Sequence, residues 1–194
     1  MTALDELELV EPASRSEWRA WLAANHASAA GAWVVTLKKS AGDPPLDYDD
    51  LVEEALCFGW VDSRIRAVDE RRTSTLVTPR KTGSLWARSN RDRVARLLAA
   101  GAMTPAGIAP VEAAKADGSW LLLEAVEELR EPPDLAEALA SNPQAAAGWE
   151  AWTPGAKRGA LTALLTAKRP ETRARRLAEL VRQAAEGTPS RGSA

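Results

Sequence analysis

A short segment of the chain carries an aromatic ring, an acid and a base at alternating positions. Trp60, Asp62 and Arg64 are spaced two residues apart, so on a β-strand their side chains would share one face. An indole, a carboxylate and a guanidinium together suit a polar ligand with a ring or a cation. An exposed strand with a cross-strand ion pair, which contributes about 0.2–1 kcal/mol, would show the same pattern. The segment is therefore a candidate wall of a binding cleft.

A loop rich in cations and hydroxyl groups follows at residues 78–84, with the sequence Thr-Pro-Arg-Lys-Thr-Gly-Ser. Arg80 and Lys81 lie just before an expected helix N-terminus, where backbone N–H groups and the helix dipole favour an anion such as phosphate or carboxylate. The loop lacks the glycine and lysine spacing of a P-loop, and a solvated turn would have the same composition. We predict that it binds an anionic group, with Asp62 and Arg64 fixing the rest of the ligand.

The predicted ligand-binding residues come from the strand, from the loop with its following helix, and from a basic C-terminal segment that we expect to close the same cleft. They are Trp60, Asp62, Arg64, Thr78, Arg80, Lys81, Ser84, Trp86, Asn90, Lys168, Arg173 and Arg176. At least one of Trp60 and Trp86 should be partly exposed at this cleft.

Other reactive groups favour structural roles. His26 is the only histidine and Cys57 the only cysteine, which excludes a multi-histidine metal site and an intramolecular disulfide. Acidic residues between Asp47 and Glu54 could gather cations through oxygen ligands, but a solvated helix face is the simpler interpretation. We therefore predict neither a metal nor a cofactor.

Charge is segregated along the chain, although the 194 residues sum to only −2. Residues 1–62 carry −8 and residues 63–96 carry +7, followed by −7 over 97–156 and +6 over 157–194. Such blocks either face one another in the fold or favour charged partners. A pI near 5.6 and the lack of a known nucleic-acid motif disfavour nucleic-acid binding.

The chain shows no sign of a membrane or export role. Its acidic N-terminus lacks the basic and apolar regions of a signal peptide, and no apolar run approaches the roughly 20 residues that span a bilayer. A single cysteine suits a reducing compartment. We predict a cytoplasmic protein without membrane insertion.

The hydrophobic pattern changes from a mixture of strand and helix periods to helix alone near Pro79. Strands are expected at 6–10, 32–38, 60–68 and 72–78, and helices at 15–25 and 48–58. Later helices are expected after Ser84 and at 105–117, 120–129, 133–140, 143–152, 154–168 and 170–187. This order predicts an α+β fold. A small antiparallel sheet with helices occupies residues 1–83, an all-helical half at 84–187 packs on it as one structural unit, and 188–194 is a disordered tail.

Several motifs resemble the YdeI/OmpD-associated, or bacteriocin-protection, family. They are Glu53-Glu54-Ala55-Leu56-Cys57-Phe58-Gly59-Trp60-Val61-Asp62, Thr78-Pro79-Arg80-Lys81, Ser84-x-Trp86-x3-Asn90, Gly101-x-Met103-Thr104-Pro105-Ala106-Gly107 and Ala167-Lys168-Arg169-Pro170-Glu171-Thr172-Arg173-x2-Arg176. The resemblance runs from about Ser16 to Gly187. Pro110 departs from the family pattern, which has a good helix former there. The resemblance implies a fold similar to the YjbR/CyaY-like group, and a link to protection against bacteriocins and cationic peptides, with no established reaction.

We expect a cytoplasmic binding or stress-protection protein that holds a small anionic ligand. One alternative is an enzyme acting on a small anionic substrate with Asp62 as its acid–base group, which requires a buried Asp62. Another is a metal-handling, frataxin-like protein that uses the acidic helix at 47–54. The identity of the ligand and the oligomeric state are left open.

Overall fold

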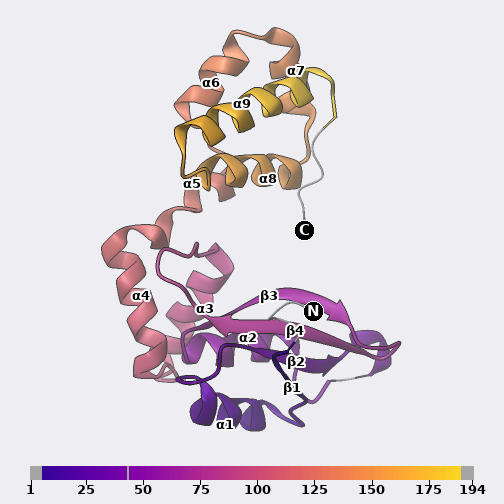
Figure 1. Cartoon of the computed structure of the whole chain (residues 1–194), viewed down its shortest axis with the longest axis vertical. Coiled ribbons are helices and arrows are strands. Elements are labelled where there is room, and N and C mark those ends of the chain that lie inside the picture. The colour runs from indigo at the N-terminus through magenta and orange to yellow at the C-terminus, as the bar shows by residue number, and fades with distance from the viewer. Residues whose placement is uncertain (1–5, 43, 189–194) are drawn as a thin grey trace. The chain divides into compact units, whose positions relative to one another are not determined.

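The computed structural model describes residues 6–42 and 44–188. The chain divides into two compact units, Met1–Leu121 and Leu122–Ala194, and each is described by itself (Figure 1). Most of the tail predicted to be disordered, residues 189–194, lies outside the described residues. No helix in the described part of the chain is long and apolar enough to cross a bilayer.

The first unit is built on a sheet whose strands follow the order β1-β2-β4-β3. The central strands β2 (Ala32–Leu37) and β4 (Arg72–Pro79) pair antiparallel, and β3 (Trp60–Ala67) pairs antiparallel with β4. β1 (Glu8–Val10) instead runs parallel to β2, so the prediction of a wholly antiparallel sheet is wrong at this edge. The reason is that helix α1 (Arg15–Asn25) connects the two strands, and a helical crossover returns the chain in the same direction.

Helices α1 and α2 (Tyr48–Cys57) cover one face of this sheet (Figure 1). Each begins at the predicted residue, because the Ser14 side chain accepts the Glu17 backbone N–H and the Asp47 side chain accepts that of Asp50. The buried side chains between helices and sheet are Trp18, Leu22, Val34, Leu51, Val52, Trp60 and Val77. The buried residues are concentrated in the central strands β2 and β4, whereas β3 buries only Trp60.

Helices α3 (Arg88–Ala99) and α4 (Pro105–Asp117) pack against α2. Two glycines make the α2–α4 approach possible: a Cβ at Gly107 would lie 2.3 Å from the Cys57 carbonyl oxygen, and one at Gly59 would lie 2.5 Å from that of Ala106. Pro110 lies inside α4 without ending it, and the helix has the predicted bounds. The missing N–H of Pro110 leaves the Ala106 carbonyl without that helical partner, and this carbonyl lies directly against Gly59.

Helices joined by short loops are the regular elements among the described residues of the second unit. Its helices are α5 (Glu124–Glu127), α6 (Pro133–Ala140), α7 (Pro143–Ala151), α8 (Pro154–Leu165) and α9 (Pro170–Ala185). The core between them contains Leu135, Ala145, Trp149, Leu161, Leu164, Leu180 and Ala184.

The predicted helix at 120–129 is replaced by a 3-10 turn, η2 (Ser119–Leu121), and the short α5. Leu129 ends α5 in the left-handed region with φ 56°. The Arg130 backbone N–H then returns to the Ala125 carbonyl at 2.7 Å, which closes the helix as a glycine usually would.

The α+β class and the switch to helix after Pro79 are confirmed, because every strand among the described residues lies before Arg80. Helices α3 and α4 belong to the unit that holds the sheet, and the division falls after Leu121 rather than after residue 83. That the whole helical half packs on the sheet as one structural unit stays a prediction.

Candidate functional site

A β-bulge in β3 decides which side chains reach the candidate site. Asp62 pairs with Val77 and Ile65 with Thr75, so Ser63 and Arg64 together face the single residue Leu76. The extra residue interrupts the alternation of side chains and re-aims those that follow. Arg64 therefore does not share the strand face of Trp60 and Asp62, and the prediction is wrong for Arg64.

The bulge brings Arg64 into an open cleft of about 490 Å³ in the first unit. Its polar lining comes from Ser63, Arg64, Thr78, Arg80 and Lys81, and its apolar lining from Ala30, Leu76 and Pro79. Three of these side chains are cations and none is an acid. The structure thus brings together four of the predicted binding residues, Arg64, Thr78, Arg80 and Lys81, in a cleft whose charge suits an anion. That they bind a ligand stays a prediction.

Arg80 is the most unusual residue of this cleft. Its guanidinium lies 3.6 Å from the centre of the Trp86 ring, and Nη1 donates to the Leu85 carbonyl at 3.0 Å and to Ser84 Oγ at 3.4 Å. Nε and Nη2 are buried and have no hydrogen-bond partner among the described residues. Burial lowers the pKa of Arg80 to about 10, against the opposing influence of the Asp62 charge.

A second, smaller cavity of about 50 Å³ also borders on Arg80. One wall is the loop from Arg80 to Trp86, and the other is formed by Pro110, Ala113, Ala114 and Asp117 of α4 with Ser119. Ser119 is 3% exposed, and its hydroxyl has no hydrogen-bond partner among the described residues. The Ser119 backbone N–H donates to Asp117 Oδ1 at 2.8 Å, and the side chain and backbone of Ser119 lower the pKa of Asp117.

Both tryptophans assigned to the cleft are buried, which contradicts the prediction that one is partly exposed. Trp60 is 1% exposed, donates its indole N–H to the His26 carbonyl at 3.3 Å and meets Trp21 edge-on. It is a core residue because β3 turns this position towards α1 and α2. Trp86 is 2% exposed, but its ring supports Arg80 and lines the smaller cavity. Only Trp86 keeps a place at the site.

Asp62 and Asn90 are not among the residues that line the two cavities beside Arg80. The half-buried Asp62 carboxylate accepts the Tyr48 hydroxyl at 2.5 Å. Burial, followed by this hydrogen bond, raises the pKa of Tyr48 to about 12. The Asn90 side chain accepts from Arg93 at 3.2 Å. The enzyme alternative required a buried Asp62, and the structure does not supply one.

The predicted C-terminal residues belong to the second unit. Arg173 Nε and Nη2 donate to the two carboxylate oxygens of Asp134 at 2.7 and 2.8 Å, and Nη1 donates to the Leu164 carbonyl at 2.9 Å. Arg176 donates to the Ala163 carbonyl and to Thr166 Oγ1 at the end of α8. Lys168 is exposed. Two of the three therefore hold the helices of their own unit together, and their closing of the cleft stays a prediction.

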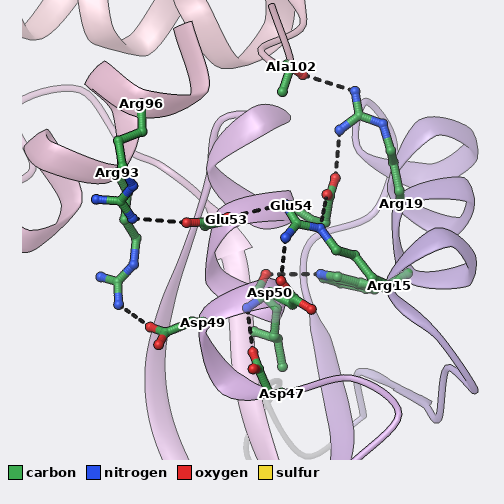
Figure 2. A network of polar contacts seen from close by, with 12 residues as sticks. Arg15, Arg19, Asp47, Asp49, Asp50, Glu53, Glu54, Arg93, Arg96 and Ala102 are labelled. Carbon is green, nitrogen blue, oxygen red and sulfur yellow. Dashed lines mark hydrogen bonds and ion pairs between the residues drawn. The ribbon is translucent and has the colours of Figure 1, made fainter. Parts of the chain in front are cut away.

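The acidic helix α2 is neutralised by arginines from α1 (Figure 2). Glu54, 4% exposed, accepts from Arg15 and from Arg19, both at 2.6 Å. Arg15 also pairs with Asp50 and with Glu53. The hydrogen bond to Glu54 raises the pKa of Arg19. These carboxylates are thus engaged in joining α1 to α2.

The opposite side of α2 is paired with α3 in the same way (Figure 2). Arg93 pairs with Asp49, Arg96 pairs with Glu53 at 3.0 Å, and Asp47 caps its own helix. Within the described residues, no group of three or more His, Cys, Asp or Glu side chains is arranged to hold a metal ion. The metal-handling alternative therefore gains no support from this helix.

Two family models divide the chain between them. A model described as a domain of unknown function (DUF8412) matches residues 10–110, more than half of the chain. The chain belongs to this family. A second model, described as "Bacteriocin-protection, YdeI or OmpD-Associated", matches residues 128–187, which confirms the predicted resemblance for that segment. No curated protein and no solved structure matches the chain.

The DUF8412 match covers the cleft and most of the smaller cavity, but several motif residues inside it have structural roles. Thr104 caps α4 and donates its hydroxyl to the Cys57 carbonyl at 2.6 Å, and Gly59 and Gly107 permit the close α2–α4 approach. The relation to the YjbR/CyaY-like group stays a prediction.

Sequence reasoning missed the walls of the site that come from outside the loop. Ser63 reaches the cleft through the bulge, and Ala113, Asp117 and Ser119 face the loop from α4 and η2. None of these residues carries a distinctive motif. No local pattern in the sequence indicates that α4 and η2 approach the loop.

Proposed function

We propose that this protein binds a small anionic ligand in the Arg64–Arg80–Lys81 cleft. We further propose that it does so in the cytoplasm as part of a protective function, against bacteriocins or cationic peptides, of the kind that the name of the second family describes. The observation that carries the proposal is Arg80, a buried cation with two N–H donors that meet no acceptor among the described residues.

The free energy of such an arrangement argues for a ligand. A buried polar group without a partner costs about 1–3 kcal/mol, and a charged group costs more. Buried charges in proteins are accordingly paired or hydrogen-bonded. Arg80 is held in place by Trp86 and Leu85, so it is fixed in position before any ligand arrives. A fixed donor that lacks only its acceptor binds an anion with little loss of side-chain freedom.

The remaining cations of the cleft support the same conclusion. Arg64 and Lys81 line it beside the hydroxyl groups of Ser63 and Thr78, and no carboxylate competes for them in this lining. A volume near 490 Å³ falls in the range of small-molecule sites, about 300–1,000 Å³. The apolar surfaces of Leu76 and Pro79 suit the carbon skeleton of an organic anion.

Binding is tested by thermal unfolding in the presence of organic anions, with uncharged amides or alcohols of the same skeletons as controls. We expect the anions alone to raise the Tm, and Arg64→Ala to reduce the rise. Arg71→Ala is the matched control, since Arg71 is an exposed arginine that does not line the cleft. A Tm that no anion raises, or an equal rise in Arg64→Ala, would refute binding in this cleft.

The protective function is tested in cells that lack the gene. The wild-type gene should restore survival under bacteriocin or cationic-peptide challenge, and a gene carrying Arg64→Ala should restore it less well at equal protein level. Equal rescue by both would separate the protective function from the cleft.

A further inference from the structure

The geometry points to the chemical group that Arg80 recognises. We propose that the Nε–Nη2 edge of Arg80 binds one phosphate group, bidentately, in the smaller cavity between the Arg80–Trp86 loop and α4. This inference rests on the proposed function, because it names the anionic group of the ligand. It assigns that group to the smaller cavity, which shares Arg80 and Lys81 with the open cleft that holds the rest of the ligand.

The first argument is which donors of the guanidinium are unpaired. Nη1 is fixed by the Leu85 carbonyl and Ser84 Oγ, while Nε and Nη2 have no partner among the described residues. Nε and Nη2 lie on one edge of the planar group and present two parallel N–H donors. Such a fork matches two oxygens of a single phosphate or carboxylate, and it matches neither a halide ion nor a lone carbonyl.

Arg173 shows the same edge fully used within this protein. Its Nε and Nη2 hold the two oxygens of Asp134 at 2.7 and 2.8 Å, and its Nη1 holds the Leu164 carbonyl. Arg80 has the equivalent carbonyl contact through Nη1, to Leu85, but no oxyanion on its other edge. An oxyanion at Arg80 would complete the arrangement that Arg173 already has.

The second argument is the size and lining of the cavity. Its volume of about 50 Å³ corresponds to roughly four water-sized positions at about 10–15 Å³ each, which suits the four oxygens of a phosphate group better than the two of a carboxylate. Lys81 and Ser84 line the same cavity and can donate to the oxygens that the fork leaves. Asp117 is the one acid among the lining residues and is exposed, so two cations outweigh one anion.

The test is calorimetric titration with inorganic phosphate, acetate and chloride at constant ionic strength. We expect wild type to bind phosphate at one site, at least tenfold more tightly than acetate, and to show no saturable binding of chloride. Arg80→Lys keeps the charge but loses the fork, and should weaken phosphate binding at least tenfold. Arg71→Ala removes an exposed arginine that lines neither this cavity nor the open cleft, and it should leave phosphate affinity within twofold of wild type.

Ala113→Leu provides a second test of the same cavity in case Arg80→Lys folds poorly. Ala113 is exposed on α4 and lines the cavity, so a leucine there narrows the site without removing a charge and should also weaken phosphate at least tenfold. Absence of phosphate binding in wild type, acetate bound as tightly as phosphate, or unchanged phosphate affinity in both Arg80→Lys and Ala113→Leu would overturn the inference. The proposed function would survive any of these results if organic anions still raise the Tm in an Arg64-dependent manner.

Discussion

Arginines in two regions of the first unit differ in what faces them. Arg15 and Arg19 of α1 surround the buried Glu54, and Arg93 and Arg96 of α3 face Asp49 and Glu53. Arg80 is also largely withdrawn from water, yet two of its nitrogens face no acceptor among the described residues. Charges of the first kind connect helices, whereas a charge of the second kind contributes little to folding.

Structural and binding arginines therefore differ in what their removal does to the free energy of unfolding, although the residue type is the same. Removing one member of a buried ion pair leaves the other charge buried without a partner, which is strongly destabilising. Removing an unpartnered buried cation relieves a cost instead. Variants in the two regions should therefore change stability and binding in opposite combinations.

The largest effect is expected at Glu54. Glu54→Ala removes the two charge-assisted hydrogen bonds that Glu54 accepts from Arg15 and Arg19. We expect a loss of about 3 kcal/mol in the free energy of unfolding, at the low end for buried pairs because both arginines are partly exposed. Urea denaturation measures it. Asp49→Ala is the control. The Asp49 side chain is 71% exposed, so its ion pair with Arg93 should contribute less than about 1 kcal/mol to the free energy of unfolding.

Arg173→Ala extends the comparison to the second unit. We expect a loss of about 1–2 kcal/mol at pH 7, a figure discounted because Arg173 and Asp134 are each about one third exposed. The Arg173 hydrogen bond lowers the pKa of Asp134 on folding. The pair therefore stabilises the unit above the ordinary aspartate pKa of about 3.9, and this contribution is lost as the pH falls through the lowered value.

Guanidinium chloride unfolding at pH 7 and at pH 2 tests both statements about Arg173. The stability difference between wild type and Arg173→Ala should narrow at the lower pH. If this stability difference were constant or larger at pH 2, the stabilising effect of Arg173 would not come from its ion pair with Asp134.

Much of the local structure could be predicted because it depends on neighbouring residues. The Ser14 and Asp47 caps, the Thr104-Pro105 start of α4 and the glycine stops are short-range signals, and the helices begin where these signals lie. The parallel pairing of β1 with β2 depends on where α1 carries the chain. The bulge at Ser63 and Arg64 depends on the register with β4. Neither is encoded in a local pattern.

The same distinction explains which site residues were found. Arg80 and Lys81 were identified because a cationic loop before a helix is visible in sequence. Trp60 was misplaced because alternation alone does not say which face of a strand the helices cover. Ala113 and Ser119 went unnoticed because only the packing of α4 brings them to Arg80.

Phosphate affinity should depend on pH through the protonation of Arg80. Because burial lowers the pKa of Arg80 to about 10, phosphate affinity should be constant from pH 8 to 9, where inorganic phosphate is largely the dianion. It should fall by about tenfold per unit once the pH exceeds the pKa of Arg80. Lysines also titrate in this range, so the fall must persist in Lys81→Ala. Calorimetry with inorganic phosphate across the range checks it, and an affinity that is flat up to pH 11.5 would contradict it.

The most direct test of the central claim, that Arg80 is a binding residue and not a structural one, is urea unfolding of Arg80→Met in plain buffer. Methionine keeps an apolar chain on the Trp86 ring while removing the unpartnered charge. Relief of that charge should roughly offset the lost bond to Leu85, so we expect a free energy of unfolding within about 1 kcal/mol of wild type. A loss of about 2 kcal/mol or more would place Arg80 with the structural arginines around Glu54 and contradict the account.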